Sequence, residues 1–120
     1  MFFTSVQYHF DSAHLLRNYK GKCASLHGHR FNVSATFAFS ELDELGISTD
    51  FGILKSNLKS IADSLDHCFL NEKPPFDKLN PTAENLSMYF FQELKKTLTK
   101  GKITKVTIYE SPTAWVEYTE

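Results

Sequence analysis

Three of the five histidines in the chain have a spacing that could bind a metal ion. His27 and His29 are two residues apart at the start of a predicted strand, so the two-residue period of a strand directs both imidazoles to one side. His14 ends the preceding predicted strand, and a hairpin would bring it beside them. Three imidazoles without a fourth protein ligand are typical of catalytic zinc. The alternative is three ordinary strand-end histidines bonded to backbone.

Cys23 precedes His27 by four residues and shares a predicted loop with several cations. These cations, Arg17, Lys20 and Lys22, would favour the thiolate form. A thiolate here could act as a nucleophile, as a base, or as a fourth zinc ligand that closes the site. The remaining alternative is a loop thiol without a role, and spacing alone leaves all of these open.

Two acidic residues, Asp66 and Glu110, lie where they could take part in catalysis or in ligand binding. Asp66 precedes His67 at the predicted end of a helix, and a carboxylate-held imidazole can shuttle protons. The alternative is a histidine that interacts with the helix dipole. Glu110 shares a strand face with Val106 and Ile108, where the pattern predicts core. A buried carboxylate needs a partner, such as a flat heterocycle with adjacent N–H groups, unless the strand end reaches water.

Hydrophobic periodicity predicts the elements that position these residues. Alternating apolar and polar residues predict four strands, over residues 6–14, 29–39, 106–110 and 114–118. Apolar residues three or four apart predict two helices between the second and third strands. The first covers 51–65, with Thr49 or Asp50 as its cap. The second has Pro81 at its first helical position and ends at Lys100-Gly101.

The predicted order, ββααββ, indicates one α+β domain over residues 1–120. We expect a four-stranded antiparallel sheet with both helices on one face. Such a sheet leaves edges and one face uncovered, which predicts a homo-oligomer.

Composition excludes several classes of protein. The net charge of −1 provides no basic field for nucleic acid, and no apolar run is long enough to span a membrane. The first residues lack the basic region and cleavage site of a signal peptide, so we expect a cytoplasmic protein. Both cysteines are then expected to be free thiols, and Cys68 to pack as a small hydrophobic residue.

Six segments, spread over nearly the whole chain, resemble motifs of the 6-pyruvoyltetrahydropterin synthase / 6-carboxytetrahydropterin synthase family, in family order. They are FDSAHLL (10–16), CASLHGHRF (23–31), DFGILK (50–55), LDHCFLN (65–71), NPTAENLS (80–87) and YESPTAWVEY (109–118). The resemblance implies a tunnelling fold (T-fold), in which the sheets of three subunits close a barrel. The expected assembly is a homotrimer or a homohexamer of two stacked trimers.

The same resemblance assigns roles to single residues. It implies zinc ligands at three positions, which are His14, His27 and His29. It makes Cys23 the catalytic thiol, acting as a base rather than as a fourth ligand.

Further implied roles concern acid–base chemistry and substrate binding. Asp66 and His67 would form a catalytic acid–base pair contributed by a neighbouring subunit. Glu110 would anchor a pterin ring through its N–H groups, and Thr82 would line that pocket.

The implied substrate is 7,8-dihydroneopterin triphosphate. Zinc would acidify its side-chain hydroxyls, and Cys23 and His67 would move protons at the side-chain carbons while triphosphate leaves. Charge alone suggests four contacts for the triphosphate, namely Arg17, Lys20, Lys22 and Arg30.

Products differ within the family. One branch makes 6-pyruvoyltetrahydropterin, a second releases acetaldehyde and leaves 6-carboxytetrahydropterin towards queuosine and other 7-deazapurines, and a third, towards folate, has Glu in place of Cys23. The short gap between Cys23 and His27 and the length of 120 residues resemble the carboxy branch. The alternatives are a pyruvoyl-forming enzyme and a non-catalytic zinc- or pterin-binding homologue. The combined presence of Cys23, Asp66, His67 and Glu110 speaks against the latter.

Overall fold

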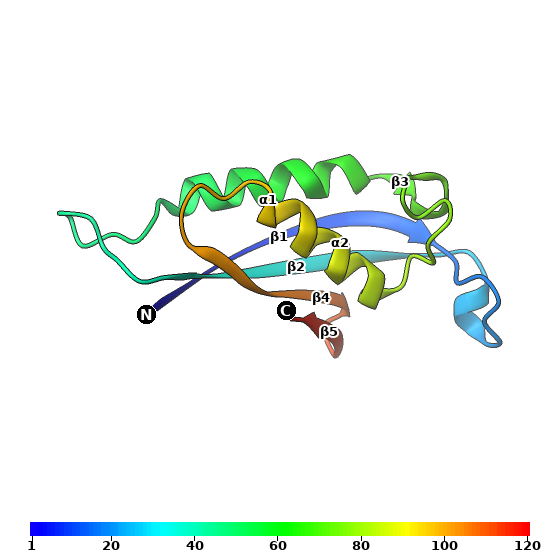
Figure 1. Ribbon diagram of the computed structural model, residues 1–120. Coiled ribbons are helices and arrows are strands. Elements are labelled where there is room, and N and C mark those ends of the chain that lie inside the picture. Colours follow the sequence, from blue (N-terminus) through cyan, green and yellow to red (C-terminus); the bar gives the residue numbers. More distant parts are fainter.

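Two long antiparallel strands form the centre of the sheet. In the computed structural model, which describes residues 1–120, β1 (Phe2–His14) pairs with β2 (His27–Phe39) along its whole length. Next to β2 lies β4 (Lys102–Ser111), and β5 (Ala114–Tyr118) forms the far edge. The pairing places His14 directly opposite His27. The connection between β1 and β2, which follows His14 and precedes His27, lies at the opposite end of the molecule from the N-terminus (Figure 1).

The sheet has a fifth strand, so the predicted four-stranded antiparallel sheet is wrong. This strand, β3 (Cys68–Phe69), runs parallel to β1 beside Ser12 and Ala13, and the complete order is β3-β1-β2-β4-β5. Two residues are too few to show a period, which explains why the sequence pattern missed it. The α+β class is confirmed, but the sheet is mixed and, within one chain, open.

Both helices lie on one face of the sheet, as the sequence predicts (Figure 1). The first, α1 (Phe51–Leu65), packs over β1, and the Asp50 carboxylate caps it by accepting the Gly52 N–H. A short 3₁₀ turn, η2 (Leu70–Glu72), follows β3. No helix is both long enough and apolar enough to cross a membrane.

The second helix, α2 (Ala83–Lys95), packs over β4 and β5 and differs from its prediction at both ends. Its cap is Thr82, whose hydroxyl accepts the Asn85 N–H, so Pro81 precedes the helix instead of starting it. It ends well before Gly101, because the N–H and the hydroxyl of Thr97 both donate to the Leu94 carbonyl and close the last turn.

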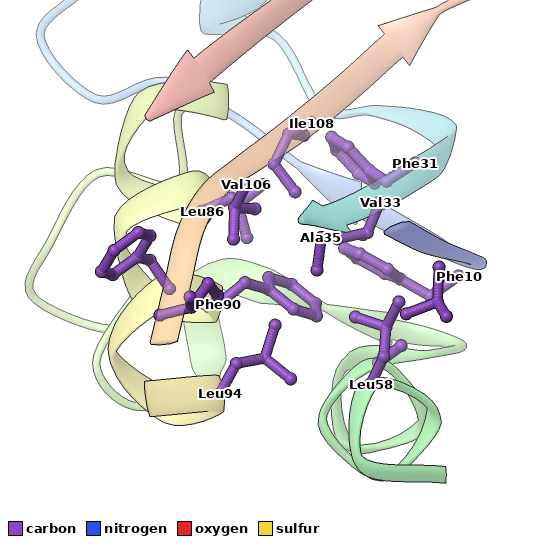
Figure 2. Packing of buried hydrophobic residues seen from close by; sticks show 14 of the residues in the cluster. Phe10, Phe31, Val33, Ala35, Leu58, Leu86, Phe90, Leu94, Val106 and Ile108 are labelled. Atoms are coloured by element: carbon purple, nitrogen blue, oxygen red, sulfur yellow. The ribbon is translucent and has the colours of Figure 1, made fainter. Parts of the chain in front are cut away.

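A hydrophobic core fills the space between the helices and the sheet. Figure 2 shows side chains of Leu86, Phe90 and Leu94 from α2 meeting those of β1, β2 and β4. The ring of Phe10 stacks on Phe31 at 5.0 Å and on Phe90 at 5.7 Å between centroids. This apolar face of β1 and β2 continues directly into the three histidines, so the packed core fixes the strands that carry them.

Candidate active site

The three predicted histidines converge at the end of the β1–β2 hairpin. One ring nitrogen from each of His14, His27 and His29 lies within 4.8 Å of the others. His14 is fully buried and the other two are half-buried. Two-residue alternation places all three on the helix-covered face, next to Phe31. We call these residues the three-histidine cluster.

Backbone carbonyls set the orientation of two of these rings. His14 Nδ1 is 2.7 Å from the Pro81 carbonyl oxygen, and His27 Nδ1 is 2.6 Å from that of Ser25. A carbonyl oxygen only accepts, so each Nδ1 carries the proton and donates it. In both rings Nε2 is therefore left with a free lone pair, which is the tautomer that a metal ligand needs.

Two ring nitrogens in the cluster are buried without any hydrogen-bond partner. They are Nε2 of His14 and Nε2 of His29. The nearest acid, Glu110, places its Oε1 3.9 Å from His14 Nε2, which is too far for a hydrogen bond. Unpartnered buried polar atoms are costly, and a bound cation would satisfy both. Three neutral imidazoles with converging lone pairs fit a zinc ion with an open fourth position.

Burial also favours the neutral form of two of these rings. Desolvation lowers the pKa of His14 below its usual value of 6.5, and the same cause lowers the pKa of His29. Only a neutral imidazole can donate a lone pair to a metal, so burial prepares the ligands for binding.

Cys23 lies near this cluster in the chain but outside it in space. It sits in a short 3₁₀ turn, η1 (Lys22–Ala24), and its backbone carbonyl accepts the Leu16 N–H at 2.8 Å. The half-buried thiol does not share the ligand spacing of the three histidines. This geometry favours a separate role for the thiol over that of a fourth ligand.

Glu110 and Thr82 line one pocket, although they belong to different elements. Glu110 comes from the end of β4 and Thr82 from the cap of α2, and the pocket wall also includes Leu16 and Trp115. Glu110 is half-buried, and its position beside His14 places this pocket next to the three-histidine cluster. Leu16 connects the same pocket to the loop that carries Cys23.

Asp66 and His67 form a second cluster, together with the β1 residue Asp11. The Asp66 carboxylate accepts the Asp11 backbone N–H at 2.8 Å and His67 Nδ1–H at 2.7 Å. These two bonds, the backbone one first, hold the pKa of Asp66 below its usual 3.8. The His67 backbone has a positive φ of 50°, and its N–H donates to the Asp11 carbonyl. The imidazole is therefore held at Nδ1, while its side chain is 79% exposed.

The two clusters are separate within one chain. Ser12 and His14 on β1 face the helices, whereas Asp11 alternates with them and faces the opposite, uncovered side of the sheet. No histidine of the three-histidine cluster belongs to the group that contains Asp66 and His67. One surface groove nevertheless reaches both clusters, since His29 and His67 both line it.

The predicted triphosphate contacts divide into two kinds. Lys20 and Lys22 are exposed on the connecting loop. Arg17 instead donates to the carbonyls of Asn71, Phe76 and Leu79. Arg30 is paired with Asp11.

Sequence reasoning missed the role of Asp11, because no periodic pattern links a strand residue to a helix end more than fifty positions away.

A sequence model of the family described as 6-pyruvoyl tetrahydropterin synthase matches residues 4–120. The chain belongs to this family. The resemblance inferred from the sequence motifs is thereby confirmed.

Curated relatives in this family carry a more specific name. The chain is similar to "6-carboxy-5,6,7,8-tetrahydropterin synthase" of Haemophilus influenzae, with 32% identity over an alignment of 142 positions that covers both chains completely. The protein of the same name from Rickettsia bellii is 30% identical over 90% of this chain and 93% of its own.

Solved structures agree on the fold. The Caenorhabditis elegans 6-pyruvoyl tetrahydropterin synthase matches with a TM-score of 0.86 at 27% identity, over 99% of this chain and 95% of its own. The Plasmodium falciparum protein of the same name matches with a TM-score of 0.74 at 23% identity, over 98% of both chains, which is evidence for the fold alone. The relatives of this family member are thus tetrahydropterin synthases, which are enzymes.

Proposed function

We propose that the chain is a zinc-dependent 6-carboxy-5,6,7,8-tetrahydropterin synthase. It converts 7,8-dihydroneopterin triphosphate and water to 6-carboxy-5,6,7,8-tetrahydropterin, acetaldehyde and triphosphate, in the cytoplasm, on the route to queuosine and other 7-deazapurines. The observation that carries the proposal is the three-histidine cluster, with two unpartnered buried nitrogens beside the pocket of Glu110. The specific reaction rests on the relatives of that name, which match over nearly the full length of both chains.

His14, His27 and His29 would hold the zinc ion, because their ring nitrogens converge without other partners. When bound, zinc supplies Lewis acidity towards hydroxyl oxygens of the substrate side chain.

Residues of the chain itself bind the pterin and move protons. Glu110 accepts two adjacent N–H groups of the ring, and Thr82 forms another part of the same pocket wall. Cys23 serves as a base at the side-chain carbons, from a loop position connected to the pocket through Leu16. His67, held at Nδ1 by Asp66, exchanges protons through its remaining nitrogen.

The working assembly is a homotrimer or a homohexamer of two trimers. This assembly is supported by the position of the two clusters on opposite faces of the sheet. In it, His67 of one subunit would lie at the site that contains Cys23 and Glu110 of another. The free edges of the sheet, β5 on one side and most of β1 on the other, offer the backbone groups for such contacts.

A second candidate is the pyruvoyl-forming reaction. It is favoured by the TM-score of 0.86 with the C. elegans enzyme of that name. That reaction eliminates triphosphate and keeps the carbon side chain.

One experiment separates these functions. Zinc-loaded protein is incubated with 7,8-dihydroneopterin triphosphate, and the products are identified by mass spectrometry. We expect acetaldehyde together with 6-carboxy-5,6,7,8-tetrahydropterin. A 6-pyruvoyl product without acetaldehyde would assign the chain to the other branch. Bound but unchanged pterin would identify a non-catalytic binding protein.

A further inference from the structure

An ion pair lies beside Asp66 and His67 on the uncovered face of the sheet. Arg30 of β2 is the direct cross-strand partner of Asp11 on β1. Its Nε donates to Asp11 Oδ1 at 2.9 Å and its terminal nitrogen donates to Oδ2 at 3.0 Å. Two parallel bonds of this kind fix both the orientation and the charge of the pair. They also hold the pKa of Asp11 below its usual 3.8.

Asp11 brings this ion pair into contact with the acid–base pair. Ligand atoms of Asp11, Asp66 and His67 all lie within 4.8 Å of one another. That spacing would also suit a metal ion, but all four carboxylate oxygens already accept hydrogen bonds. Asp11 is occupied by Arg30, and Asp66 by the Asp11 N–H and His67 Nδ1. The group is therefore a charge network in which His67 Nε2 alone lacks a partner within the group.

We propose that Arg30 is a positioning residue for the Asp66–His67 pair, acting by neutralising Asp11. The proposal rests on the reaction proposed above, in which His67 exchanges protons with the substrate. With Arg30 in place, one guanidinium offsets one of two carboxylates, and the imidazole faces a single uncompensated negative charge. Without Arg30 it would face two, and a second nearby carboxylate favours the protonated imidazole. By offsetting Asp11, Arg30 thus favours the neutral imidazole of His67, which is the form that can accept a proton at Nε2.

Other groups around His67 leave this balance unchanged. Cys68 on β3 follows it in the chain, and its thiol bonds to the Leu65 carbonyl. The nearby acid of α1, Asp63, already forms an ion pair with Lys59. Apart from Asp11 and His67 themselves, the surface groove beside His67 is formed by uncharged residues of β1, β2 and β3, together with His29. Arg30 is therefore the cation that offsets Asp11, which leaves the Asp66 carboxylate as the single uncompensated charge beside His67.

Nuclear magnetic resonance of the imidazoles tests the proposal directly. Zinc-loaded, full-length protein is labelled at histidine Cε1 and titrated with acid, and His9→Gln distinguishes the exposed His9 from His67. We expect Arg30→Gln to raise the titration midpoint of His67 by roughly 0.5–1 pH unit, because it leaves the partly exposed Asp11 carboxylate uncompensated within 4.8 Å of the imidazole. Asp11→Asn should lower the midpoint. The double variant should return it close to the original value.

If the two single substitutions move the His67 midpoint in opposite directions and the double variant restores it, the effect of Arg30 is electrostatic. A distorted site would not be restored by a second substitution. Arg30→Lys, which keeps the charge, should leave the midpoint nearly unchanged. Lys105→Gln is the matched control, since it removes a cation from the ion pair with Glu117 between β4 and β5. An unmoved His67 midpoint in Arg30→Gln would overturn the proposal.

Kinetics connect the charge effect to turnover. In Arg30→Gln, the acidic limb of the pH profile of kcat/KM should shift to higher pH by as many pH units as the NMR midpoint of His67 does. The KM at the optimal pH should stay unchanged. A raised KM with an unmoved limb would overturn the proposal and make Arg30 a triphosphate contact. The cancelling NMR pattern in protein that does not turn over the pterin would support the role of Arg30 and refute the proposed function.

Discussion

The histidines on the two faces of the sheet differ in what surrounds them: the Nε2 atoms of His14 and His29 are shielded from water, whereas His67 is exposed and bonded to a carboxylate. Burial lowers the pKa of His14 and His29, which keeps their lone pairs available for a cation. Near His67 the controlling feature is charge, because Asp66 is ionised and fixed by two donors. Desolvation therefore suits the first group to metal binding, and a paired carboxylate suits the second to proton exchange.

Replacement of Cys23 by alanine tests whether this thiol is a base or a ligand. We expect Cys23→Ala to lower kcat at least about a hundredfold, the usual contribution of a general base. Bound zinc should remain at about one ion per subunit, because the thiol lies outside the three-histidine cluster. Product assays and metal analysis measure the two effects. The matched control is Cys68→Ala, which should turn over normally, whereas loss of zinc from Cys23→Ala would make the thiol a ligand.

At the scale of elements, the sequence predicts what is periodic and misses what is local. The long alternations of β1 and β2 and the α1 stripe are read correctly, because many residues repeat one environment. The two-residue β3 and the early end of α2 depend on individual hydrogen bonds, such as those of Thr97 to the Leu94 carbonyl. The three histidines follow from strand period and pairing. The Asp11–Asp66 contact arises from how α1 returns to β1, which no local pattern encodes.

Thr82 caps α2, and in the proposed function it also forms part of the substrate pocket. Thr82→Ala removes the hydroxyl that accepts the Asn85 N–H, so we expect a loss of about 1 kcal/mol of unfolding free energy. Because Thr82 also lines the Glu110 pocket, KM should rise several-fold. Asp50→Ala is the matched control, since it removes the cap of α1 away from the pocket. It should cost similar stability and leave KM unchanged; equal KM values for both variants would exclude Thr82 from the pterin site.

The loop between β1 and β2 contains one cation that bonds to the protein, Arg17, and two exposed ones, Lys20 and Lys22. The Arg17 guanidinium holds the segment from η2 to Leu79 through three carbonyls, so Arg17→Met should cost about 2 kcal/mol of unfolding free energy. Its KM should stay unchanged. Lys20→Ala with Lys22→Ala should show the reverse, with a several-fold higher KM and an unchanged Tm. Denaturation and steady-state kinetics compare the variants, and an unchanged KM in the lysine variant would remove those residues from triphosphate binding.

For the whole molecule, the free edges of the sheet bear on the proposed homo-oligomer. The chain is elongated, with a longest extent of 53 Å, and its sheet ends in free strand edges at β5 and along most of β1. A free edge presents unpaired backbone groups, which a second copy can satisfy. Asp66 and His67 lie near the β1 edge, where β3 adds only two residues, while Glu110 lies on β4 towards the other edge. Edge-to-edge pairing of copies would bring these groups together.

Mixing two inactive variants tests whether each site spans two subunits. Cys23→Ala and His67→Ala should each be nearly inactive alone, because each lacks one proton-transfer group. If Cys23 and His67 of one site come from different chains, random co-assembly in equal amounts rebuilds about a quarter of the sites. We therefore expect co-refolded mixtures to regain about a quarter of the activity, with no gain when separately folded proteins are mixed briefly. A mixture that stays inactive, although native mass spectrometry shows mixed oligomers, would place Cys23 and His67 of each site in the same chain.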